Sequence, residues 1–161
     1  MLRTDDIYDE ILRNHLLSNV EQKKPLYEVS HQAIGVNLEC GDEITIHVYK
    51  HHDVIHDISF HGKCCPTVKA SASLMIEELR GRTRHDAIEL AKRAQLLANN
   101  QIKEDGVFDT LVKQLCKYSI NNNNSSFVKC ALLPWETMVD ATRNHVTKNN
   151  NKKRDYSLYI E

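Results

Sequence analysis

The sequence predicts an α+β fold, in which a small antiparallel β-sheet of about three strands packs against four to five helices. Two observations support this prediction. Between about residues 27 and 60, apolar residues alternate with polar ones, which is the period of a half-buried strand. From residue 66 onward, apolar residues recur every three or four positions, which is the period of a helix with one buried face. The helices are then expected to cover one face of the sheet.

The first elements expected along the chain are one helix and three strands. The helix is predicted over residues 4–18, where an apolar stripe has helical spacing. Strand periodicity follows in three stretches, at about 27–36, 44–49 and 54–60. In the third stretch Val54, Ile58 and Phe60 are assigned to one buried face. The short link over residues 50–53 suits a hairpin between the second and third strands.

Helices are predicted for most of the remaining chain. Apolar residues at helical spacing mark three of them, at about 66–80, 85–98 and 108–116. A last helix is predicted to begin near Ala131, which places Pro134 in a first turn, where proline is tolerated. Residues 121–126 are expected to form a polar loop. We therefore expect one domain over residues 1–147 and a polar C-terminal tail over residues 148–161.

The composition excludes several classes of partner. The formal net charge of −1 gives no electrostatic case for binding nucleic acid or a membrane surface, and 6% aromatic residues are too few for a base-stacking surface. No apolar run reaches the roughly 20 residues of a membrane-spanning helix. The acidic, polar start differs from a secretory signal, so we expect a cytoplasmic protein. In that reducing compartment the five cysteines are expected to be thiols or thiolates.

Three of these cysteines lie at predicted junctions between elements. Cys40 is followed by Gly41, which permits a tight turn, and by Asp42, so that a thiolate and a carboxylate can point at one centre. Cys65 and Cys130 are each placed just before a helix, where the helix dipole lowers a thiol pKa. This pattern favours a metal site with three thiolates. The alternative is that each cysteine is a small buried hydrophobe.

The other two cysteines and the histidines point to no further site. Cys116 completes an apolar helical stripe and is assigned to the core. Cys64, beside Cys65, is expected to point elsewhere and is given an auxiliary role at most. The nine histidines do not form the His-Glu-x-x-His motif of zinc peptidases, and the zinc deaminase signature is also absent.

The residues around the three cysteines resemble the IscU/NifU-type iron–sulfur cluster assembly proteins, and most closely their SufU branch. Four stretches carry the resemblance: Cys40-Gly41-Asp42, Ile55–Gly62, Cys65 with Ala70–Met75, and Cys130–Trp135. Together they span about residues 4 to 145. The resemblance implies a SufU/IscU-like domain, in which the residues at about 83–120 are the helical insertion of the SufU branch.

The resemblance also implies a metal site and a role for it. The ligands would be Cys40, Asp42, Cys65 and Cys130. The metal would be zinc, because Lys129 stands where the scaffold branch has a histidine before its third cysteine. SufU-branch proteins typically accept persulfide sulfur from a cysteine desulfurase, so Cys40 is expected to be the catalytic sulfur acceptor of a zinc-dependent sulfurtransferase. The expected partners are a cysteine desulfurase and iron–sulfur assembly or acceptor proteins.

Two alternatives to sulfur transfer stay open. In the first, the same thiolates hold iron, and the protein is a scaffold on which a [2Fe–2S] cluster is assembled and passed on. In the second, zinc stabilises a small fold that binds a partner protein. Three positions depart from the family pattern: Cys64 replaces a usual glycine, Pro66 a small residue, and Phe127 a frequent arginine.

Overall fold

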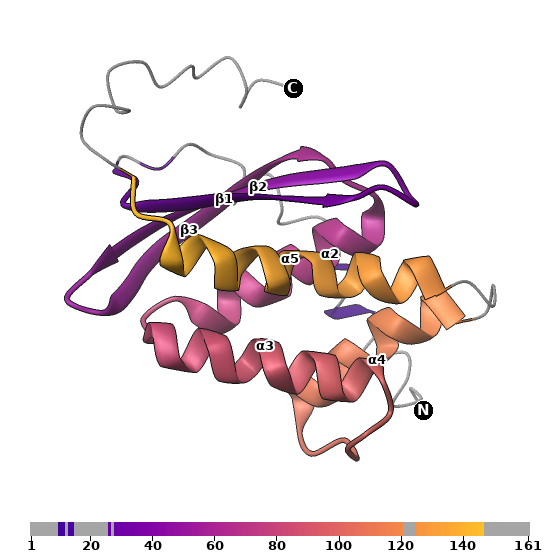
Figure 1. The fold of residues 1–161 in the computed structure, drawn as a ribbon. Helices are drawn as coiled ribbons and strands as arrows, with labels where there is room; N and C mark the ends of the chain where they lie inside the picture. The colour runs from indigo at the N-terminus through magenta and orange to yellow at the C-terminus, as the bar shows by residue number, and fades with distance from the viewer. Residues whose placement is uncertain (1–9, 12, 15–25, 27, 121–124, 147–161) are drawn as a thin grey trace.

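The computed structural model describes residues 10–11, 13–14, 26, 28–120 and 125–146. Within this part the elements are β1 (His31–Asn37), β2 (Asp42–His51), β3 (Val54–Lys63), α2 (Pro66–Leu79), α3 (Arg84–Ala98), α4 (Val107–Ile120) and α5 (Ser125–Arg143). Figure 1 shows the three strands as one sheet, with these helices on one side of it. The predicted α+β fold is confirmed.

Several expectations fall partly or wholly outside the described residues. Of the helix expected over 4–18, residues 10–11 and 13–14 are described, and they are helical. The first part of the expected polar loop, residues 121–124, and the expected tail, residues 148–161, lie outside the described part of the chain. No described helix is long and apolar enough to cross a membrane.

The sheet is antiparallel throughout, in the order β1-β2-β3. Ile44, Ile46 and Val48 of β2 are fully buried in the core shared with the helices, as their alternation predicts. A two-residue turn joins β2 to β3, and its residues His52 and Asp53 have positive φ angles of 51° and 64°. Two positive φ angles are typical of a type I′ turn, whose twist matches that of the strands it joins.

One prediction for β3 is wrong. Val54 is only partly buried, whereas Ile55 is fully buried and takes its place in the core with Ile58 and Phe60. The register between β2 and β3 shifts at this end of the hairpin and leaves His56 as an extra residue in β3. An extra residue reverses the alternation of faces along a strand, so Ile55 turns inward.

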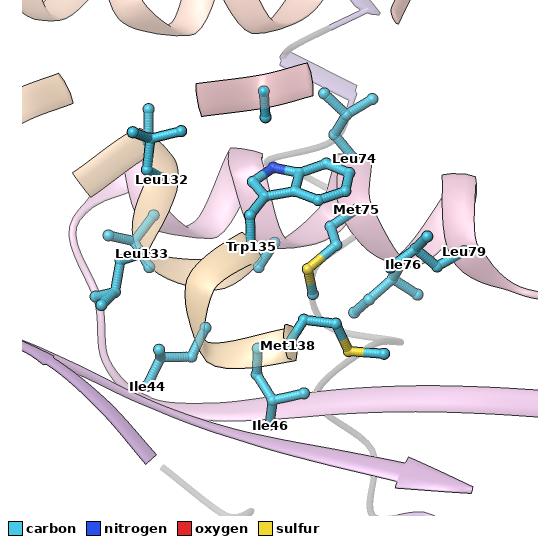
Figure 2. Close-up of a cluster of buried hydrophobic side chains, with 14 of the residues drawn as sticks. Ile44, Ile46, Leu74, Met75, Ile76, Leu79, Leu132, Leu133, Trp135 and Met138 are labelled. Atoms are coloured by element: carbon cyan, nitrogen blue, oxygen red, sulfur yellow. The ribbon is translucent and has the colours of Figure 1, made fainter. Parts of the chain in front are cut away.

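α5 is the central helix of the fold. It packs against β1 and β2 on one side and against α2, α3 and α4 on the others, and Figure 1 shows it between the sheet and α3. Figure 2 shows Trp135 and Met138 of α5 in one buried cluster with Ile46 of β2 and Met75 of α2. Phe108 of α4 packs edge-on against Trp135, with ring centroids 5.5 Å apart. The helices at about 83–120, α3 and α4, therefore pack against α5 and contribute side chains to the same hydrophobic core.

The prediction that the last helix begins near Ala131 is wrong, because α5 begins at Ser125. The last two residues of the expected polar loop are therefore helical. Pro134 lies in the helix interior, where it has no N–H to donate to the carbonyl of Cys130. Tertiary contacts hold this turn instead: the Ser71 hydroxyl of α2 donates to the carbonyl of Ala131 over 2.5 Å.

An ion pair between a partly exposed arginine and a buried carboxylate connects α3 with α4. The Asp109 carboxylate is 2% exposed and accepts hydrogen bonds from the Arg93 guanidinium and from the backbone N–H of Asp105. Hydrogen bonding to Arg93 holds the Asp109 pKa below its usual value. We expect Arg93→Met to lower the free energy of unfolding by about 1–3 kcal/mol at pH 7, because a buried carboxylate then lacks its cation.

The effect of Arg93→Met has a defined pH dependence. A carboxyl whose pKa is lower in the folded state stabilises the fold above its unfolded pKa of about 3.9, and this contribution is lost as the pH falls through the lowered pKa. In urea unfolding, the stabilities of the wild type and of Arg93→Met should therefore begin to converge as the pH falls below about 4 and become equal only below the lowered pKa of Asp109. Lys92→Met, which removes an exposed cation of α3, is the control and should change little. Equal stability of Arg93→Met and wild type at pH 7 would contradict the prediction.

Candidate metal centre

The turn between β1 and β2 carries the first two predicted site residues. Asn37, the last residue of β1, pairs with Asp42, the first residue of β2. The Gly41 N–H donates to the Asn37 carbonyl over 2.9 Å and closes the turn between them. Gly41 has a φ of 71°, a conformation that favours glycine. The turn leaves Cys40 exposed, whereas Asp42 is only 3% exposed. A thiol and a carboxylate two positions apart thus have very different access to solvent.

The third residue comes from α5. Cys130 lies in the second turn of this helix, so its predicted position just before a helix is wrong. It is fully buried, and its Sγ lies 3.3 Å from Cys40 Sγ and 3.1 Å from Asp42 Oδ2. The ligand atoms of the three residues all lie within 4.8 Å of one another. The fold thus brings together two sulfurs from residues 90 positions apart in the chain.

Cys65 lies beside this group and is hydrogen-bonded to Asp42. It is the N-cap residue of α2, and its backbone N–H donates to Asp42 Oδ1 over 2.8 Å. Its thiol is partly buried and interacts with the side chains of Asp42 and Cys130. The four residues that the family resemblance implies are therefore neighbours in space, with Cys65 next to the three-residue group.

The thiol pKa values differ from the prediction. Helix N-termini were expected to lower them, but burial raises the pKa of Cys65 and that of Cys130, and the neighbouring Asp42 raises both further. Desolvation outweighs the helix dipole here because these thiols are withdrawn from water and lie next to a carboxylate. A metal cation would remove that cost, since it deprotonates the thiols that coordinate it. The donor set of sulfurs and one carboxylate suits zinc.

The remaining cysteines are not part of the group. Cys116 is buried in the core, as predicted, and burial raises its pKa to about 11. Cys64 directs its thiol to the carbonyl oxygen of Glu43, 3.4 Å away. Phe127, one of the departures from the family pattern, lies in the first turn of α5, and its side chain is outside the described part of the structure.

Two contacts next to the site are not foreseen from the sequence. Asn37 Nδ2 donates to Cys130 Sγ over 3.2 Å in the protein interior. On the surface, Lys129 Nζ lies 2.8 Å from Glu39 Oε1, and this hydrogen bond raises the Lys129 pKa. The sequence holds one signal for the first contact, an asparagine at the end of a strand, three positions before Cys40.

Comparison with known proteins identifies related chains. The sequence is 31% identical over 109 residues to the iron–sulfur cluster assembly scaffold protein IscU of Thermotoga maritima, covering 68% of this chain and 74% of the relative. It is 24% identical over 137 residues to the zinc-dependent sulfurtransferase SufU of Bacillus subtilis, covering 83% of this chain and 88% of the relative. A crystal structure of SufU from Fervidobacterium islandicum has a TM-score of 0.67 at 29% identity, covering 86% of this chain and 98% of that one.

The family follows from a match over most of the chain. The family model described as the NifU-like N terminal domain matches residues 15–150, which include β1 to α5 and the four predicted site residues. The N-terminal part of a NifU-like protein from Brucella abortus shares the fold, with a TM-score of 0.62 at 15% identity, covering 82% of this chain and 95% of that one. This chain therefore belongs to the family of NifU-like N-terminal domains, with IscU and SufU proteins among its relatives.

Proposed function

We propose that this chain is a zinc-containing sulfur acceptor that takes persulfide sulfur from a cysteine desulfurase and serves iron–sulfur cluster assembly. The observation that supports this most directly is the unequal exposure of two adjacent sulfurs. Cys40 is exposed on a turn, while Cys130 is fully buried with its Sγ only 3.3 Å away. A partner protein can therefore reach the first sulfur without disturbing the second.

Four residues would hold the zinc: Cys40, Asp42, Cys65 and Cys130. When bound, zinc would keep its sulfur ligands deprotonated at neutral pH despite their burial. Asp42 has a second task, because its Oδ1 accepts the backbone N–H of Cys65 and so fixes the start of α2 against the β1–β2 turn. Burial suits Asp42 and Cys130 to remain in place while Cys40 reacts.

The proposed reaction takes place at Cys40. Its thiolate attacks the outer sulfur of the persulfide on the desulfurase. A new S–S bond forms at Cys40, the S–S bond of the donor breaks, and the donor cysteine leaves as a thiolate. The exchange needs no external oxidant, because one S–S bond replaces another. Cys40 then carries the persulfide at the surface, where an iron–sulfur assembly protein can take the sulfur.

A second candidate function is that of a scaffold on which a [2Fe–2S] cluster is assembled and passed on. It is favoured by the names of two relatives, the IscU scaffold proteins of Thermotoga maritima and of Streptococcus pyogenes, the latter 29% identical over 126 residues. Against it stands Lys129, which occupies the place of the scaffold branch's histidine and is paired with Glu39 on the surface.

We propose that residues 1–147 form the functional domain, with α3 and α4 as an insertion over about 83–120, and that residues 148–161 are a tail outside it. The contacts of α3 and α4 with α5 support their place in the same domain. We further propose that the protein acts in the cytoplasm, where thiols stay reduced.

Metal analysis and sulfur transfer, measured on the same purified full chain, test the proposed function. We expect about one zinc per chain, and transfer of radiolabelled sulfur from cysteine to the chain when a cysteine desulfurase is present. Iron with acid-labile sulfide, passed on to an apo-protein, would support the scaffold instead. A zinc protein that accepts no sulfur and unfolds on chelation would support a purely structural zinc module.

A further inference from the structure

Asn37 contacts both parts of the chain that form the candidate site, the β1–β2 turn and α5. It ends β1 on the face of the sheet that meets α5, directly opposite Asp42 in the register of β1 and β2. Its side chain is 7% exposed, and its Nδ2 donates to Cys130 Sγ over 3.2 Å. The same sulfur lies 3.1 Å from Asp42 Oδ2. An uncharged donor and an acidic side chain therefore meet at one buried sulfur.

The same asparagine also shapes the turn that exposes Cys40. Its Oδ1 accepts the backbone N–H of Glu39 over 3.2 Å, and its carbonyl accepts the N–H of Gly41 over 2.9 Å. Side-chain bonds of this kind are common where Asn or Asp begins a turn. Of these two residues, only asparagine also has an N–H group to offer, and this N–H is the group that reaches Cys130.

We propose that Asn37 is a positioning residue that gives the sulfurs of Cys40 and Cys130 different roles. Its N–H stabilises Cys130 as the thiolate that stays on the metal, while its Oδ1 holds the turn that presents Cys40 as the sulfur that reacts. This inference rests on the proposed zinc-dependent function. Hydrogen bonds to a ligating sulfur draw charge from it and tune the metal centre. An amide does not titrate, so its N–H is available as a donor at every working pH.

Two substitutions separate the donor from the acceptor. Asn37→Asp keeps the shape and the acceptor for Glu39 but replaces the N–H donor by a carboxylate oxygen. Asn37→Ala removes both. If the donor to sulfur matters, both variants should lose zinc affinity by about 10–100-fold in chelator competition at pH 8. In cobalt-substituted protein, the sulfur-to-cobalt charge-transfer band should move to lower energy in both, since the sulfur is no longer stabilised.

A matched control keeps a loss of packing apart from a loss of the hydrogen bond. Thr137 of α5 lies against Gly35 of β1, and its hydroxyl donates to the carbonyl of Leu133 in its own helix, so Thr137→Val alters the β1–α5 contact away from the sulfurs. It should leave zinc affinity and the cobalt band unchanged. Wild-type affinity and spectrum in Asn37→Asp, with or without a defect in Asn37→Ala, would overturn the proposal. So would a defect in Asn37→Asp alone, which would reflect the introduced charge.

A measurement on the wild type covers the case in which neither variant folds. Protein loaded with cadmium-113 and labelled with ¹⁵N-asparagine should show a scalar coupling between the metal and one side-chain amide proton of Asn37, transmitted through Cys130 Sγ. The absence of this coupling would overturn the inference. Sulfur acceptance by the same wild-type preparation tests the proposed function separately: a chain that accepts sulfur but lacks the coupling refutes only the role of Asn37.

Discussion

Cys40→Ala is expected to abolish the transfer of sulfur from a cysteine desulfurase to this chain. Cys40 is the exposed sulfur of the three-residue group, and the adjacent Cys130 is fully buried. The variant should stay folded, because an exposed side chain on a turn contributes little to the core. The measurement is the formation of a protein-bound persulfide, followed as radiolabelled sulfur or as a mass increase of one sulfur atom.

Cys64→Ala is the matched control for Cys40→Ala. Cys64 is another partly accessible thiol near the site, but its Sγ is directed to the carbonyl of Glu43 and it is not a member of the group around Cys130. Its replacement should leave the transfer rate unchanged. A normal rate of acceptance by Cys40→Ala, or a loss in Cys64→Ala alone, would show that another thiol is the acceptor.

Asp42→Ala is expected to lower the zinc affinity more than 100-fold, a greater loss than is usual when only a residue behind a ligand is changed. The substitution removes a proposed ligand and also the acceptor of the Cys65 backbone N–H, so the start of α2 loses its connection to the β1–β2 turn. The measurement is a chelator competition, with circular dichroism to establish that the variant is folded.

Asp42→Asn separates the two tasks of this carboxylate. The amide oxygen can still accept the Cys65 N–H, but it lacks the negative charge that complements a cation. We expect the zinc affinity of Asp42→Asn to fall nearly as far as that of Asp42→Ala, while its thermal stability without metal stays closer to the wild type. Asp57→Ala, an exposed carboxylate of β3, should behave as the wild type. Tight zinc binding by Asp42→Asn would show that the carboxylate is not a ligand.

The elements were predictable wherever one local pattern determined the outcome. The alternation around Ile46 and the glycine turn at Gly41 both led to the observed structure, because face and φ angle are local properties. Two errors came from features that depend on tertiary contacts. The extra residue His56 moved Ile55 to the buried face, and packing on α2 and the sheet let α5 continue through Pro134.

The family resemblance grouped four candidate residues that the fold places near one another, whereas the sequence did not predict the electrostatics around them. The family resemblance implied the residues that the fold brings together, including Cys130, which is 88 positions from Asp42 in the chain. The predicted positions of Cys65 and Cys130 just before helices indicated lowered thiol pKa values, because the helix dipole favours a thiolate there. Their burial, which sets the opposite direction, depends on how α5 crosses the sheet, and spacing along the sequence does not reveal that. The hydrogen bond from Asn37 to Cys130 also depends on how α5 packs against the sheet.

The central place of α5 has a consequence for the order of events during synthesis on the ribosome. The sheet and α2 to α4 emerge first, yet each of these helices, together with β1 and β2, packs against α5. Domains fold as units during translation, so the core closes only after this late segment has left the exit tunnel. Cys130 reaches the β1–β2 turn and the start of α2 only with this helix, so we expect a newly made chain to bind the proposed metal fully only at that stage.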